Sequence, residues 1–247
     1  MTLKEEREMV EIEKCLTFKP DGDEHTTRSH WDASYPYDVS PTNLPNNYNG
    51  VKAVFLSTEK RLDRQPAWKE VYAGQIHDLL DRGVAVKLNQ EDMDNWTGPV
   101  WYISHLIAPN PHSKTTPCRI VWNSSQPYQG VSLNSCLLKG PDFLNPLRGV
   151  LIRFREGVFA IIGDVTKMYN SIYLVERECH MHRFLWRDEK TQEIGIYMIV
   201  RVNIGDRPAG CLNLVSTRKT AELPEFRDIP KAVETVQKHG FFSFFNV

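Results

Sequence analysis

The spacing of apolar residues changes character at Gly83. Before it, two segments repeat apolar side chains at helical spacing, and the Asp-Arg-Gly that ends the second provides a glycine suited to a left-handed helix cap. After it, β-branched and aromatic residues dominate, which indicates strands. The predicted helices are residues 51–64 and 67–82, and the predicted strands are residues 84–88, 100–106 and 118–122. The loop NPHSKTT lies between the last two strands, so we expect it to form the tip of a β-hairpin.

The remaining segments also mix helix and strand patterns. Residues 25–50 are rich in Pro, Asn, Ser and Tyr, which is typical of a long connection. Further helices are predicted at residues 3–16, 140–155 (opened by Pro141), 208–222 and 226–238, and further strands at residues 158–163, 183–186 and 194–202. Because this order is irregular, it favours an α+β fold over a doubly wound parallel sheet.

Charge and composition limit the function classes. The formal charge of −1 excludes nucleic-acid binding by bulk charge alone, although residues 1–50 carry −5 and residues 51–247 carry +4. The five cysteines are scattered and include no CxxC motif, as in proteins with reduced thiols. No apolar run reaches the ~20 residues of a membrane helix, and the acidic N-terminus does not resemble a signal peptide. We therefore expect an intracellular protein, cytoplasmic or nuclear, without a membrane partner.

Two short patterns contain residue types that bind metals or act in catalysis. Asp164 follows the apolar run FAIIG, where a carboxylate is costly unless it caps a helix or binds a metal, and from the sequence alone the cap is the better interpretation. His180 and His182 would share one face of a strand, but no second ligand pair follows at a suitable spacing, so we interpret them as structural. A serine-hydrolase elbow, a P-loop and GxGxxG are all absent from the sequence.

Ordered blocks from Leu3 to the C-terminus resemble the reverse transcriptase region of BEL/Pao-type LTR retrotransposons. The blocks are LKEEREMVEIEKCL, SPTNLPNNYNG, STEKRL, WYISHLIAPNPHSKTTPCRIVWNSS, VSLNSCLLKGPDFLNPLRGVLIRFRE, FAIIGDVTKMY, HRFLWRD and RKTAE. The resemblance implies a right-hand polymerase fold, represented here by the fingers and part of the palm, without a thumb, an RNase H domain or an integrase. It implies three regions: an N-terminal helix and extended connection (residues 1–50), a fingers-like region (residues 51–139) and a partial palm (residues 140–247).

The same resemblance assigns roles to individual residues. Asp164 matches the first catalytic aspartate of the palm, a ligand of both Mg²⁺ ions, with the carbonyl of Val165 as a second ligand. Tyr169 matches the aromatic residue that excludes a ribose 2′-hydroxyl. Arg119 resembles the fingers arginine that binds the incoming triphosphate, with Lys114 beside it on the hairpin tip. Gly205 falls in the loop that contacts template and nucleotide, although Ala209 stands where many members have Ser. The implied partners are an RNA template and a DNA primer.

One departure from the family concerns the remaining catalytic carboxylates. Where members carry a Tyr-Val-Asp-Asp turn, this chain reads Phe241-Phe242-Ser243-Phe244. Two-metal phosphoryl transfer needs several carboxylates, and Asp206, Asp228 and Glu234 do not lie on the strand that should face Asp164. We therefore expect the chain to be inactive as a polymerase. The uncharged, Phe-rich segment 241–245 is also an aggregation hazard that favours self-association.

Two alternative functions remain. The first is a nucleic-acid-binding module without chemistry, and the second is a truncated gene product without function. The basic side chains that could line a nucleic-acid groove are Lys87, Arg148, Arg153, Arg155, Arg218 and Lys219.

Overall fold

The computed structural model describes residues 2–21, 26, 28–113, 116–142, 144–155, 158 and 165–239. It combines short sheets with helices, which confirms the mixed α+β class. The helices are α1 (Leu3–Lys14), α2 (Tyr48–Asp63), α3 (Pro66–Asp81), α4 (Gln90–Asn95), α5 (Leu133–Cys136), α6 (Leu147–Arg153), α7 (Glu176–His180), α8 (Ala209–Ala221) and α9 (Pro230–Glu234). The strands are β1 (Leu16–Lys19), β2 (His30–Ala33), β3 (Ala85–Lys87), β4 (Ser104–Pro109), β5 (Cys118–Asn123), β6 (Ile172–Leu174), β7 (Arg183–Arg187) and β8 (Ile194–Ile199).

Three sheets organise these strands in the described part of the chain. One has the order β1-β2-β6, in which β1 and β2 are antiparallel and β2 and β6 are parallel. A second, antiparallel sheet has the order β3-β8-β7, and the third is the antiparallel hairpin β4-β5. Strand β3 comes from the region that the resemblance assigns to the fingers, whereas β7 and β8 come from the palm region. Strands from both regions therefore share one sheet.

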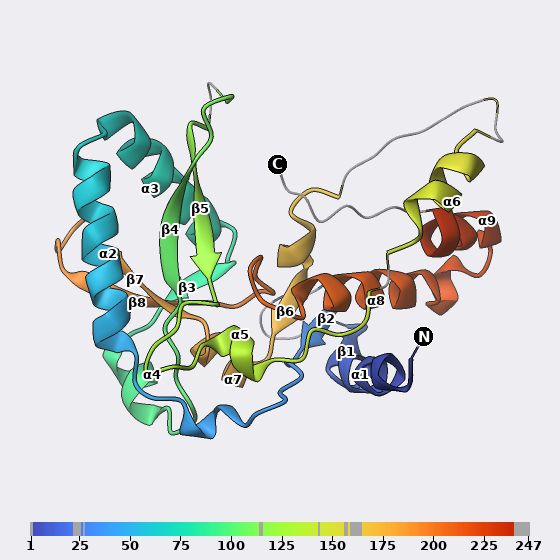
Figure 1. Cartoon of the computed structure of the whole chain (residues 1–247), viewed down its shortest axis with the longest axis horizontal. Coiled ribbons are helices and arrows are strands. Elements are labelled where there is room, and N and C mark those ends of the chain that lie inside the picture. Colours follow the sequence, from blue (N-terminus) through green and yellow to red (C-terminus); the bar gives the residue numbers. More distant parts are fainter. Residues whose placement is uncertain are drawn as a thin grey trace.

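The hairpin β4-β5 is packed against α2 and α3 at one side of the molecule (Figure 1). The predicted helices at residues 51–64 and 67–82 are confirmed, and Gly83 has the left-handed φ of +60° expected of a cap. The predicted hairpin is also confirmed, since β4 and β5 pair antiparallel with Pro109 opposite Cys118 on either side of the tip. The first of its strands begins later than expected, at Ser104, because the backbones of Trp101 and Ile103 pair with His180 and Arg183 and not with β5.

The other end of the molecule contains α1, α6, α8 and α9 (Figure 1). Helix α8 lies in the largest core cluster and is buried around most of its circumference over residues 209–216. Helix α1 begins with a capping box formed by Thr2 and Glu5 and buries only Ile12, in agreement with the thin apolar stripe of its sequence. No helix in the described ranges is both long and apolar enough to cross a bilayer.

Several predicted boundaries were wrong. The segment 25–50 is not only a connection, because it contains β2 and the first turn of α2. The helix expected over residues 140–155 is shortened to α6, and that over 226–238 is divided into a 3-10 turn, α9 and a π-helical turn. The strand expected at residues 158–163 lies outside the described residues, apart from an exposed Val158.

Candidate functional site

Arg119 lies on the open face of the β4-β5 hairpin. Side chains alternate along a strand, so Cys118 and Ile120 point to one face and Arg119 and Val121 to the other. The first face packs against α2 and α3, with Cys118 in a core cluster that includes Tyr72. The second face keeps Val121 44% exposed. The sheet therefore presents the half-buried Arg119 on the side away from the two helices.

A buried histidine fixes the hairpin to its surroundings. Tyr72 donates a hydrogen bond of 2.8 Å to Nδ1 of His105, and Nε2 of His105 donates one of 2.8 Å to the carbonyl oxygen of Leu185. Because a carbonyl oxygen can only accept, Nε2 carries the proton of the neutral imidazole, and Nδ1 accepts from the Tyr72 hydroxyl. Burial of His105 lowers its pKa to about 4. This side chain joins β4 to both α3 and β7.

Gly205 lies at the base of the same hairpin. Its φ is +111°, and a Cβ atom added to it would approach the carbonyl oxygen of Trp122 to 2.6 Å. Trp122 is three residues from Arg119 along β5, so the structure brings Gly205 and Arg119 to one strand. The close approach that requires glycine is made to the protein's own backbone.

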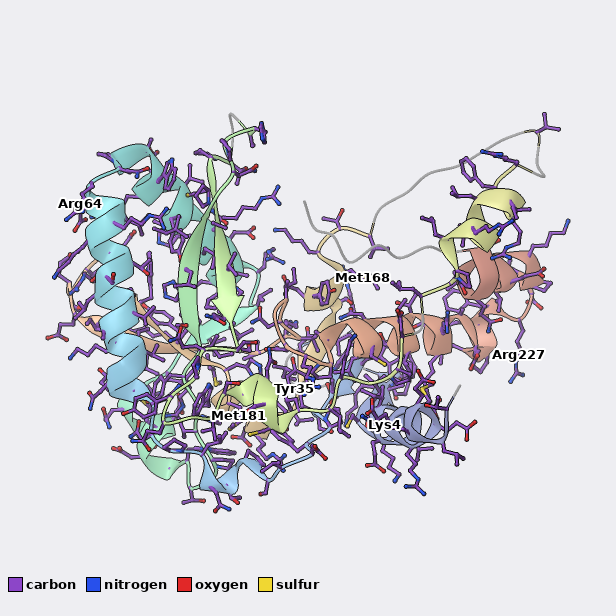
Figure 2. The ribbon with its side chains drawn as sticks, in the orientation of Figure 1. Lys4, Tyr35, Arg64, Met168, Met181 and Arg227 are labelled. Atoms are coloured by element: carbon purple, nitrogen blue, oxygen red, sulfur yellow. The ribbon has the colours of Figure 1, made fainter. Side chains whose placement is uncertain are left out.

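Four buried side chains hold the loop that follows Gly205. Asp206 is fully buried at its side chain and accepts hydrogen bonds of 2.5 Å from Ser124 on Oδ1 and 2.5 Å from Tyr35 on Oδ2. His182 adds a 3.0 Å contact from Nε2 to Oδ2. Tyr35, labelled in Figure 2, lies in the middle of the molecule, between the lobe of α2 and α3 and the end that contains α1 and α8. The sequence identified Asp206 only as an acid and did not indicate the contacts with its partners, which come from three distant segments.

The segment that begins at Val165 leads toward the core. Val165 is 52% exposed, whereas Tyr169 is buried in the largest core cluster, where burial raises its pKa to about 12. Between them, Lys167 adopts a left-handed φ of +54° and places Nζ 2.7 Å from Asp78 on α3. Asp164 and Lys114 lie outside the described residues.

The two histidines of the His-x-His pattern have separate structural partners. His180 ends α7 instead of lying on a strand, stacks on Trp96 at 4.0 Å and accepts hydrogen bonds from Arg183 at Nδ1. Burial and the Arg183 guanidinium lower the pKa of His180 to about 4. Since His182 contacts Asp206, the geometry agrees with the structural interpretation.

The described side chains assemble no metal group, and two of the basic side chains proposed for a groove contact carboxylates. Within these ranges no cluster of three or more His, Cys, Asp or Glu residues could hold a metal ion. The basic side chains proposed for a groove are spread over β3, α6, α8 and the turn after α6. Lys87 contacts Asp188 at 2.5 Å, and Lys219 lies 4.0 Å from Glu13. Comparison of the chain with protein-family models and with curated proteins found no match.

Proposed function

We propose that this chain is the fingers and part of the palm of a BEL/Pao-type reverse transcriptase, an RNA-directed DNA polymerase region whose partners are an RNA template and a DNA primer. The proposal rests first on the ordered sequence blocks. The structural observation that carries it is Arg119, which stands on the open face of a two-stranded hairpin with Gly205 at the base of the same strand. A guanidinium in that position suits the oxygens of a triphosphate, because it offers several hydrogen-bond donors in one plane.

The proposed role of Arg119 is tested by measuring triphosphate binding. We expect Arg119→Ala to weaken binding of a fluorescent dNTP, measured by anisotropy, about tenfold or more, equivalent to ~1.4 kcal/mol. Arg119→Lys should recover only part of the affinity, since an ammonium cannot make the bidentate contact. The matched control is Arg61→Ala on α2, an exposed arginine that contacts the ring of Trp68. Equal affinity of Arg119→Ala and the unsubstituted chain would refute this assignment.

The donor set does not fit the two Mg²⁺ ions of the family. At the palm position the sequence offers the Asp164 carboxylate and the Val165 carbonyl, and the Tyr-Val-Asp-Asp position holds Phe241-Phe242-Ser243-Phe244. Two Mg²⁺ ions about 3.5–4 Å apart need several carboxylates between them. We therefore assign no catalytic step to these residues and infer that the chain does not polymerise DNA by itself.

Primer extension tests the inferred inactivity. An RNA template with a DNA primer, dNTPs and Mg²⁺ or Mn²⁺ should give no extended product on a gel. Template-dependent product that disappears in Asp164→Ala would contradict this inference and would show that another carboxylate replaces the missing ones.

Nucleic-acid binding without chemistry is the alternative that the charges favour less. Because the basic side chains are dispersed and two of them contact carboxylates, we expect a Kd for an RNA–DNA hybrid in the micromolar range or weaker, with a shallow salt dependence. Fluorescence anisotropy at several salt concentrations measures both. Nanomolar affinity that is lost in Arg119→Ala would favour a binding module instead.

Self-association through residues 241–245 is a separate proposal. Those residues lie outside the described part of the chain, and the argument is compositional: four Phe and one Ser without charge or proline. Deletion of residues 241–247 should increase the soluble fraction and give a monomeric elution volume in size-exclusion chromatography. The same solubility and elution volume for both chains would rule this out.

A further inference from the structure

His182 has a hydrogen-bond environment that differs from that of an ordinary buried histidine. Its Nδ1 lies 2.6 Å from the carbonyl oxygen of Glu178, and its Nε2 lies 3.0 Å from Oδ2 of Asp206. A carbonyl oxygen and an ionised carboxylate can only accept hydrogen bonds. A neutral imidazole has a single N–H to donate. Both contacts are therefore satisfied when the ring carries two protons.

The surroundings of Asp206 match an ionised carboxylate. Ser124 donates to Oδ1, and Tyr35 and His182 donate to Oδ2, so three donors converge on two oxygens. Burial by itself would lower the pKa of His182 and raise that of Asp206. Attraction between the two groups and the surrounding hydrogen bonds outweigh burial in both cases, which raises the pKa of His182 and lowers that of Asp206.

The pair lies where three elements meet. Ser124 follows β5, His182 precedes β7, and Asp206 precedes α8, whose Ala209 amide donates to the Asp206 carbonyl at 3.1 Å. The adjacent backbone is held as well. Asn134 on α5 donates to the Gly205 carbonyl at 2.8 Å and accepts from the Arg207 amide at 2.8 Å. The loop 203–208 is thus fixed across the base of the hairpin that carries Arg119.

We propose that His182 and Asp206 form a buried ion pair that positions the loop 203–208 against β5, and that this pair sets the affinity of the Arg119 face for a nucleoside triphosphate. The second half rests on the function proposed above. Removal of the negative charge from Asp206 removes the attraction that stabilises the doubly protonated ring, so the ring loses a proton and the charge-assisted hydrogen bond between the loop and His182 is lost.

The stability that the pair contributes is lost at both high and low pH. The other titratable groups that face it are Glu178, whose fully buried carboxylate accepts from Tyr37 at 2.6 Å and lies 3.3 Å from Arg177, and Tyr35, whose pKa is raised by burial and by Asp206. The stability that His182 contributes is complete below pH 6.5 and is lost as the pH rises through its raised pKa. The contribution of Asp206 is lost only when the pH falls through its lowered pKa.

Nitrogen NMR of the histidine-labelled chain tests the ion pair directly. We expect the His182 resonances, assigned by their absence in His182→Gln, to report two protonated nitrogens with a titration midpoint above pH 6.5. The midpoint should fall below that of the unsubstituted chain in Asp206→Asn. A control is Asp32→Asn, which removes the carboxylate that lies 3.2 Å from Nε2 of His30 on β2, a similar His–Asp contact that does not touch the loop. A midpoint for His182 at or below pH 6.5 in the unsubstituted chain would overturn the ion pair.

Hydrogen exchange and dNTP binding test what the pair positions. In Asp206→Asn the amides of residues 203–209 should exchange at least tenfold faster while those of β7 and β8 keep their rates, and dTTP affinity should fall at least fivefold. Faster exchange throughout the chain, or unchanged exchange rates in residues 203–209, would show that the pair does not position the loop. Faster exchange in these residues with unchanged dTTP affinity would overturn only the proposed effect of the pair on triphosphate binding. If the unsubstituted chain binds no dTTP, the proposed function and this coupling fail together, whereas the NMR and exchange results still decide the ion pair and its loop.

Discussion

The charge state of a buried histidine in this protein is determined by whether its neighbours accept or donate hydrogen bonds. His105 and His182 are both fully buried, yet the first has a donor and an acceptor as partners and is neutral, whereas the second has two acceptors and is charged. Apart from Glu178, which lies 4 positions from His182, the partners of the two histidines lie 24 to 80 positions away, and the sequence does not indicate them. The charge state of either residue could not be predicted without the fold.

Gly205 provides the residue-scale prediction. Its selection from the sequence rested on resemblance to a substrate-contacting loop, whereas the structure adds a conformational requirement: a φ of +111° and a carbonyl oxygen 2.6 Å from any Cβ. We expect Gly205→Ala to lower the free energy of unfolding by about 2–3 kcal/mol in urea denaturation. As a control, Gly74→Ala in the exposed face of α3, where a Cβ meets no atom within 4 Å, should raise it by up to about 1 kcal/mol. An unchanged free energy of unfolding in Gly205→Ala would contradict the described contact.

At the scale of elements, local pattern was sufficient for some segments and not for others. Helices α2 and α3 and the hairpin were predictable because their periodicity extends over many residues and Gly83 marks the change. Strand β2 was missed because its four residues show no period, and its pairing with β1 and β6 depends on partners elsewhere in the chain. Short strands of this kind are determined by tertiary contacts more than by propensity.

The junction of α2 with the segment that directly precedes β4 leads to a second prediction. The buried Asn47 accepts from the Tyr102 amide at 2.9 Å and donates to the Tyr102 carbonyl at 2.7 Å. Asn47→Ala leaves both backbone groups without these partners, so we expect a loss of about 2–4 kcal/mol in unfolding free energy. Its exposed neighbour Asn46 makes one hydrogen bond, to the Tyr48 amide, and Asn46→Ala should cost about 1 kcal/mol. Equal losses in the two variants, compared by urea denaturation, would argue against this role of Asn47.

For the whole molecule, buried neutral histidines predict sensitivity to acid. The pKa values of His105 and His180 are about 4 in the folded protein, whereas both take up protons near pH 6.5 when unfolded. The unfolded state therefore binds more protons between these values, and the stability falls as the pH drops from 6.5 to 4. His182 does not offset the loss, because its contribution is already complete below pH 6.5.

Denaturation midpoints at pH 6.5 and 4.5 measure this effect. For the fully buried His105 the loss approaches ~1.4 kcal/mol per pH unit below 6.5. His105→Gln should lower the stability at pH 6.5 but make it depend less on pH, while His77→Gln, which changes a half-exposed histidine 3.2 Å from Glu189, should keep the original dependence. The same pH dependence in His105→Gln as in the unsubstituted chain would show that the acid sensitivity arises elsewhere.

From the sequence, candidate site residues could be named only where they matched a motif. Arg119 and Gly205 were named from such matches; Arg119 lies on β5, and Gly205 packs against the carbonyl oxygen of Trp122 on the same strand. Tyr35 and Ser124 gave no signal, and the His-x-His pattern identified His182 without its partner, because the Asp206 cluster is assembled from four segments that are remote in the sequence. A buried polar cluster depends on tertiary geometry, and neither hydrophobic period nor residue spacing encodes it.

We propose that Asp164 is the palm aspartate of a reverse transcriptase fold whose partner carboxylates are replaced by Phe241-Phe242-Ser243-Phe244. The most direct test of this proposal is Mn²⁺ affinity, measured by electron paramagnetic resonance, for the chain with Phe241→Tyr, Phe242→Val, Ser243→Asp and Phe244→Asp. We expect this variant to bind Mn²⁺ at least tenfold more tightly than the unsubstituted chain, and the gain to be lost when Asp164→Ala is added. No gain in affinity, or a gain that persists without Asp164, would contradict it.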